Sequence, residues 1–348
     1  MNNQDERQLS FFREMEALYR DAVISGQATY DARFMHQMFC VAGLPLREPA
    51  TRTFSRSTGL MGLNIAPGSI TLPDGQELEI GIPYGPKARL IVLSAISEAR
   101  SPLRQEGDRW IEIGRIETWL KDIGVLRGSR SGQVMTMAKD QLIRLSLAQF
   151  STTYRLPGRR VLLSNDRIMD AGAFDEEELR LYAKNDVPNE DRRSNLSRVR
   201  WPEAIRMSEK AFKMFRADDA VPIPSSRLTQ VSHSALAIDL FLFLCYTLPG
   251  IPQGDPQLVR WKDLINWFGN KRDAPSKFKE TFLPALSLAM KAYPEANISA
   301  DDMTDEGLLL HYSDPAALRQ AFMSVQSLPG PVREQKRRRR KIDVDDAA

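Results

Sequence analysis

A short polar turn and the segment after it contain the residues of this sequence best suited to bind a ligand. Residues 127–132 are small, polar and cationic, and a helix is expected over residues 133–149. A helix that enters the major groove of DNA needs such a first turn, because it must reach base edges and phosphates. Arg130, Gln133 and Thr136 are the candidate base readers, since Arg pairs with guanine and Gln with adenine through two contacts.

Cations surround this segment. Between residues 127 and 160, seven Lys or Arg residues accompany one acid, Asp140. Such a concentration of positive charge favours contact with the phosphate backbone, although a solvated helix face with a charged turn would carry the same residues. The further DNA-binding candidates of this region are Arg127, Ser131, Lys139, Arg155, Arg159 and Arg160.

Two more basic regions lie toward the C-terminus, although the net charge of the chain is only +3. Asp273 and Glu280 dilute the first region, so a solvated basic face is an equal alternative there. The second is a run of six cations that would add salt-sensitive DNA affinity, or would act as a targeting signal in a nucleated cell. The candidates in the two regions are Lys271, Arg272, Ser276, Lys277 and Lys279, and then Lys336, Arg337, Arg338, Arg339, Arg340 and Lys341.

Residue patterns for catalysis are missing from the sequence. His36, His233 and His311 are isolated, with no second His or Cys at the spacing of metal ligands. The turn at 128–132 lacks the lysine of a phosphate-binding loop, and scattered carboxylates are expected to be surface charges. We therefore expect no enzyme activity, no metal and no cofactor.

The elements expected around the candidate helix follow the order of a winged helix. A helix from Pro86, a strand at 109–113, a helix at 116–120 and the helix at 133–149 precede a basic hairpin at 151–163. The order then repeats, with helices at 234–248, 261–268 and 276–292 and a strand at 308–312. The fold class predicted is α+β and helix-rich, with two tandem winged-helix domains.

The domain boundaries follow from these patterns. We expect an N-terminal helical extension over 1–60, a first winged-helix domain over 61–218, a second over 219–327 and a disordered basic tail over 328–348. Residues 221–226 are expected to form the linker. The extension is predicted to contribute to a homodimer, because it has more apolar surface than a small appendage needs, although packing on the first winged helix is the alternative. Its apolar residues are Phe11, Phe12, Phe34, Met35, Met38 and Phe39.

The sequence indicates a cytoplasmic protein with no membrane association. The chain has two cysteines, Cys40 and Cys245, and their distance in the sequence argues against a disulfide framework. The charged first 25 residues lack the apolar stretch of a secretion signal. The most apolar run, 234–249, is too short to span a bilayer and contains Asp239.

Two stretches resemble the plasmid-encoded RepA family of replication initiators. One runs from Ile82 to Ala99 and continues through Trp119 to Val125, and the other is 234–244. The resemblance implies a protein that binds double-stranded DNA at repeats of a plasmid origin (iterons), helps to open the duplex, recruits the host initiator and the replicative helicase, and represses its own promoter. The stretch at 127–137 departs from the family pattern, because it has no aromatic residue.

Two other functions fit the same residues. A transcriptional repressor with tandem winged helices, not involved in replication, would have the same elements. A protein-interaction scaffold with an incidental basic tail would show no salt-sensitive duplex binding.

Overall fold

The computed structural model describes most of the chain. The described residues are 3–25, 32–59, 61–125, 132–155, 161–172, 174, 176, 179–180, 201–216, 220–269, 274–314 and 322. The fold is α+β, as predicted, and its helices and strands are mixed along the whole chain. None of the described helices is long and apolar enough to cross a membrane.

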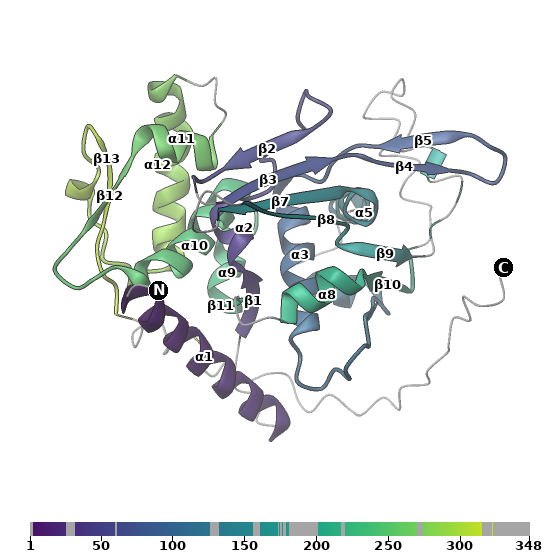
Figure 1. The fold of residues 1–348 in the computed structure, drawn as a ribbon, viewed down its shortest axis with the longest axis horizontal. Coiled ribbons are helices and arrows are strands. Elements are labelled where there is room, and N and C mark those ends of the chain that lie inside the picture. The colour runs from purple at the N-terminus through teal and green to yellow at the C-terminus, as the bar shows by residue number, and fades with distance from the viewer. Residues whose placement is uncertain are drawn as a thin grey trace.

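A unit of four described helices and a small sheet occupies the middle of the chain (Figure 1). Its sheet is antiparallel with the order β6-β10-β9, so β10 returns from far along the chain to lie between the other two strands. The elements of this first unit are α3 (Gly85–Ala99), β6 (Trp110–Glu112), α4 (Ile116–Asp122), α5 (Gly132–Leu147), β9 (Met169–Gly172), β10 (Ala204–Met207) and α8 (Glu209–Arg216).

The second unit repeats the order helix, strand, helix, helix. It ends in a strand that pairs with its first strand to form a two-stranded sheet. Its elements are α9 (Ser225–Val231), α10 (Ala235–Thr247), η1 (Leu248–Gly250), β12 (Gln257–Arg260), α11 (Trp261–Phe268), α12 (Pro275–Ala292), η2 (Ala300–Asp302) and β13 (Gly307–Leu310). This repeated order is the one that the sequence predicts. The division into two separate winged-helix domains stays a prediction.

The hairpin expected as the wing of the first unit forms, but in a different sheet. Strands β7 and β8 pair as predicted, with Tyr154 opposite Leu162, yet β7 also pairs with β3 from Gln149 to Tyr154. The resulting antiparallel sheet has the order β2-β3-β7-β8, and β4 and β5 form a separate hairpin beside it. The strands are β2 (Phe54–Ser57), β3 (Met61–Ala66), β4 (Gly68–Thr71), β5 (Glu77–Ile80), β7 (Gln149–Arg155) and β8 (Val161–Asp166).

The segment expected as a linker is instead a buried strand, β11 (Ala220–Pro224). It pairs with β1 (Ala32–His36), which places Pro222 opposite Phe34 and Pro224 opposite Ala32. Among the described strands β11 has a neighbour on one side only, so its prolines remove no hydrogen bond from the interior of that sheet. The Pro-rich composition thus reflects an edge strand.

The N-terminal region is packed into the molecule rather than appended to it. Helix α1 (Asn3–Ile24) contacts η1 and β11, and the short helix α2 (Gln37–Val41) packs on α10 (Figure 1). The six apolar residues assigned to a dimer contact are all at most 5% exposed within one chain. The reason given for dimerisation is therefore wrong, because this apolar surface is consumed by intramolecular packing.

One hydrophobic core joins the two units. It runs without interruption from α1 through the first unit to β13. A buried ion pair crosses it: the Arg89 guanidinium on α3 donates to both carboxylate oxygens of Asp239 on α10, each at 2.6 Å. This contact explains the acid found inside the apolar run 234–249, because that carboxylate is neutralised by a cation from the other unit.

Candidate nucleic-acid interface

Helix α5 has the apolar face that the sequence predicts. Ala138, Leu142, Leu145 and Ala148, at and just after the helix, are all buried. Gln133, in the first turn, is exposed, and its side chain makes no hydrogen bond within the described part of the chain. The helix therefore presents one of its three candidate base readers at the expected place.

Two of the residues assigned to DNA contact on α5 are buried, which corrects their assignment. Thr136 is 5% exposed and its hydroxyl donates to the carbonyl oxygen of Gly132. Lys139 is 1% exposed, with its ammonium nitrogen 5.9 Å from the centre of the Trp201 ring. The apolar pattern identified one buried face of α5, but it did not show that Trp201, just before β10, lies over Lys139 or that Thr136 is bound to the helix backbone.

The structure describes one of the remaining DNA-binding candidates of the first unit. Arg155 is exposed at the end of β7. Arg127, Arg130 and Ser131, and likewise Arg159 and Arg160, lie outside the described residues.

The second unit presents its candidates at the start of α12. Ser276 and Lys277 are exposed in the first turn of this helix. Lys279 is half-buried, because its ammonium lies 4.3 Å from the centre of the Trp261 ring. Lys271, Arg272 and the cations of residues 336–341 lie outside the described residues.

The first turn of α12 is open to an anion. Its N-cap residue, Ala274, has no side-chain atom that can accept a hydrogen bond, and Pro275 follows at the first helical position. The amides of the first turn carry a partial positive charge that such a cap would otherwise neutralise. Helix α10 differs, since the Ser234 hydroxyl accepts from the Ala237 amide at its N-terminus.

A groove of about 920 Å³ runs past this helix start. Its lining residues come from α11, α12 and the start of α10, and from residues 45–51, Thr53 and β2. The polar and cationic residues that line it are Arg47, Glu48, Thr51, Thr53, Ser55, Arg56, Ser234, Asn266, Lys277 and Thr281. The sequence offered no signal for this groove, because its walls come from segments about 200 residues apart.

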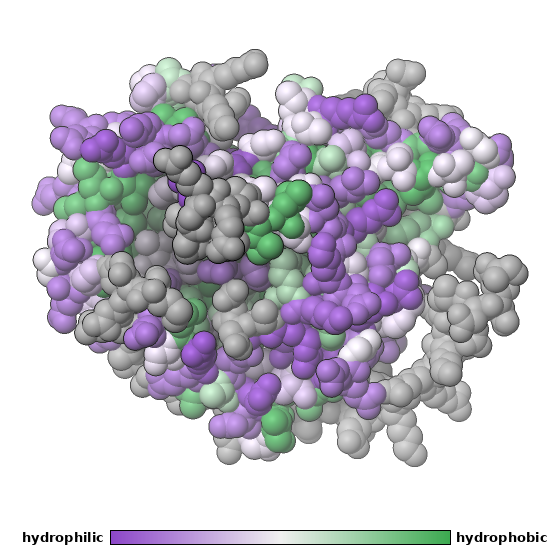
Figure 2. All heavy atoms as spheres, viewed as in Figure 1, coloured by the Kyte–Doolittle hydropathy of each residue, from purple (hydrophilic) through white to green (hydrophobic). Residues whose placement is uncertain are grey.

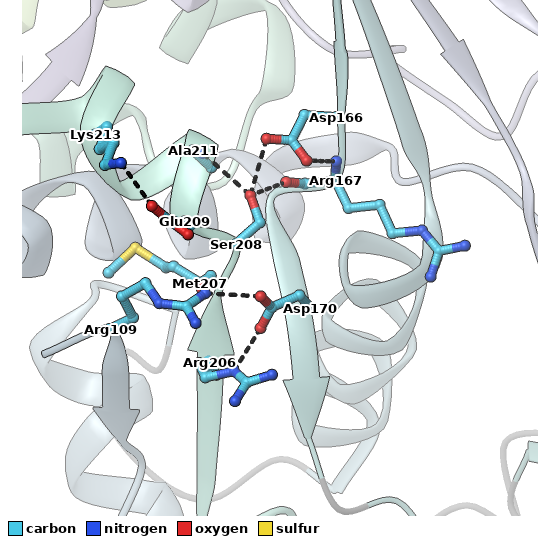
Figure 3. Close-up of polar contacts among 10 residues, drawn as sticks. All are labelled: Arg109, Asp166, Arg167, Asp170, Arg206, Met207, Ser208, Glu209, Ala211 and Lys213. Atoms are coloured by element: carbon cyan, nitrogen blue, oxygen red, sulfur yellow. Dashed lines mark hydrogen bonds and ion pairs between the residues drawn. The ribbon is translucent and has the colours of Figure 1, made fainter. Parts of the chain in front are cut away.

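Another polar cluster lies where β9, β10 and α8 meet (Figure 3). Asp170 accepts from Arg109 at 2.7 Å and from Arg206 at 2.6 Å, so one carboxylate serves two cations. The Ser208 hydroxyl accepts from the Ala211 amide and donates to the Arg167 carbonyl oxygen, which caps α8. Figure 2 shows hydrophilic side chains gathered over this part of the surface.

The cations of this cluster are largely neutralised within the fold. Beyond the two arginines on Asp170, Lys213 pairs with Glu209 at 2.5 Å. The sequence analysis did not select these residues, because the arginines and Asp170 are distant in the chain and only the sheet β6-β10-β9 brings them together. No group of three His, Cys, Asp or Glu residues suited to a metal ion occurs in the described ranges.

Comparison with known proteins gives low similarity. No family model and no curated protein matches the chain. A crystal structure of the selenomethionine derivative of domains 2 and 3 of RctB matches with a TM-score of 0.42 and 11% sequence identity, over 72% of this chain and 84% of that one. A second, of RctB residues 155–483, gives a TM-score of 0.38, 11% identity, and coverage of 74% and 84%.

Both TM-scores are below 0.5, so the proposals below rest on the residues of this chain. Its resemblance to the RepA family likewise stays a prediction.

Proposed function

We propose that this chain is a sequence-specific DNA-binding protein of the replication-initiator type, which acts by gripping and deforming duplex DNA and has no catalytic chemistry of its own. One observation carries the proposal. The order helix, strand, helix, helix occurs twice, and each copy presents exposed polar or cationic residues in the first turn of its third helix, Gln133 in α5 and Ser276 with Lys277 in α12. A helix start of this kind can reach base edges and phosphates.

The junction between the units supports a role in DNA deformation. The shared core and the Arg89–Asp239 pair hold the units in one arrangement, so less orientational freedom is lost when both bind one duplex. Bending a site of 20 to 30 base pairs costs about 1 to 6 kcal/mol, which two sets of contacts can offset. Opening of an origin would then be driven by binding energy and supercoiling, with host proteins recruited to the opened DNA.

The test is duplex binding by the full chain over a salt series. One fragment carries the DNA that flanks the gene of this protein, and the other is a scrambled duplex of equal length. We expect a preference for the flanking fragment that persists as salt rises, because base contacts depend less on counterion release than phosphate contacts do. Equal, steeply salt-dependent binding to both fragments would leave only a basic nucleic-acid binder, and no binding would favour the scaffold.

A second assay separates initiation from repression. A plasmid that carries the flanking repeats should be maintained only when the chain is supplied. Repression of a reporter without plasmid maintenance would identify a repressor instead.

A further inference from the structure

The groove beside α12 contains a buried arginine whose hydrogen bonds are incomplete. Arg56, on β2, is 4% exposed. Its Nη2 reaches the carbonyl oxygen of Gly269 at 3.4 Å, whereas Nη1 has no hydrogen-bond partner among the described residues. Burial of a charged donor without a partner lowers the stability of the fold. An arginine at such a position therefore points to a role other than stability.

The charge of Arg56 is present at neutral pH. Burial lowers the pKa of Arg56 to about 10; Asp239 opposes this shift and Arg89 adds to it. A guanidinium with that pKa is still protonated near pH 7, and Arg56 is among the residues that line the groove. A ligand that enters the groove can supply the partner that the fold does not.

The surroundings of Arg56 are suited to an anion. Lys277, which also lines the groove, is exposed in the first turn of α12, where no side chain caps the helix. Among the described residues that line the groove, Glu48 is the one acid, and its carboxylate is paired with Arg144 at 2.9 Å. Two hydroxyl groups that line the groove are already used within the fold, because Thr51 donates to the Thr53 carbonyl oxygen and Ser55 to the Asn64 side-chain oxygen.

We propose that this groove binds a phosphate group, held by the Arg56 guanidinium, the Lys277 ammonium and the first-turn amides of α12. Arginine offers several donors in a fixed plane, lysine a point charge, and a helix start a row of amides, and this combination suits a phosphate with several acceptor oxygens. The phosphate source that we expect is the backbone of the bound duplex, because the groove adjoins the helix start assigned to DNA contact. In that form the inference rests on the proposed function and adds β2 to the DNA-binding surface.

The experiment measures duplex affinity and the response to inorganic phosphate for three variants of the full chain. Arg56→Met removes the buried guanidinium, and Lys277→Gln removes an exposed ammonium with little risk to folding. Lys291→Gln, at the other end of α12, is the matched control, since Lys291 is exposed and does not line the groove. Fluorescence anisotropy over a salt series gives the affinity, and melting in phosphate against chloride at equal ionic strength gives the response to the free ion.

We expect Arg56→Met and Lys277→Gln each to weaken duplex binding about tenfold and to lower the salt slope by about one, while Lys291→Gln changes neither. Phosphate should raise the melting temperature of the wild type and not that of Arg56→Met. If both groove variants bind duplex and phosphate as the wild type does, the site is refuted and the proposed function stands.

The two proposals can fail separately. If the wild type binds no duplex but its response to phosphate depends on Arg56, the site is supported with a free phosphate compound as its ligand, and the proposed function is refuted. If the wild type binds neither, both proposals are refuted.

Discussion

Two arginines of similar burial lie in neighbouring regions, and they differ in how many partners the fold gives them. Arg89, at the junction of α3 and α10, donates from all three nitrogens to Asp239 and to the carbonyl oxygens of Leu44, Pro45 and Gly85. Arg56, in the groove, has one long bond to Gly269, and its Nη1 has no hydrogen-bond partner among the described residues. Burial alone therefore does not assign a role to a cation. The completeness of its hydrogen bonds separates a structural arginine from one that is available to a ligand.

The largest effect is expected at the junction. Arg89→Met leaves the Asp239 carboxylate buried without its partner, so we expect a loss of about 3 to 5 kcal/mol in the free energy of unfolding. Urea unfolding of the purified chain measures it. The double variant Arg89→Met, Asp239→Leu should recover part of the loss, and a single variant as stable as wild type would show that the pair does not hold the units together.

A neutral side chain on the surface, Gln133, can also be classified by whether the fold gives it hydrogen-bond partners. Gln133 is exposed and makes no side-chain hydrogen bond to described residues, so Gln133→Ala should leave the melting temperature unchanged. Loss of a two-point base contact should reduce discrimination between the flanking and scrambled duplexes by about 1 to 3 kcal/mol. Gln149→Ala, another exposed glutamine near the far end of α5, serves as control. Equal discrimination by both variants would remove Gln133 from the site.

At Arg56 the stability effect should have the opposite sign to that at Arg89. Because burial lowers the pKa of Arg56 to about 10, folding disfavours its protonated form. That cost is fully present below pH 10 and is relieved only as the pH rises from 10 toward the unfolded value. We therefore expect Arg56→Met at pH 7 to be as stable as wild type or more stable, by up to about 1 kcal/mol in urea unfolding. A loss of several kcal/mol would make Arg56 a structural residue like Arg89.

The smallest effect is expected in the cluster around Asp170. Asp170→Asn releases two partly exposed arginines from their shared carboxylate, and duplex affinity should rise about two- to threefold at low salt. The anisotropy assay at low and high salt measures it. An unchanged affinity at low salt would place this surface away from bound DNA.

Patterns that depend on local spacing were predicted well from the sequence. The apolar positions of α5 and the pairing of β7 with β8 follow from the 3.6-residue and two-residue periods of helices and strands, and the structure confirms both. The repeated order of helices and strands was found in the same way. These features need no knowledge of what packs against them.

Features that depend on distant partners were not predicted. Lys139 was assigned to DNA because it is a cation on the less apolar side of a helix, but a segment some 60 residues later, which contains Trp201, covers it. The basic hairpin was taken for a wing because nothing in its sequence reveals that β3 pairs with β7. The groove at Arg56 joins β2 to α12 and is likewise a property of the folded chain.

The pairing of β1 with β11 sets an order on folding during synthesis. Ala32 leaves the ribosome about 190 residues before its partner Pro224, an interval of roughly 10 to 40 s at ordinary translation rates. Until β11 has been made, the apolar side chains of α1 and β1 lack the strand that covers them. The incomplete chain is therefore most prone to aggregation at its N-terminal end. A chaperone that binds nascent chains would bind this N-terminal segment. The whole first unit must be synthesised before the segment is buried.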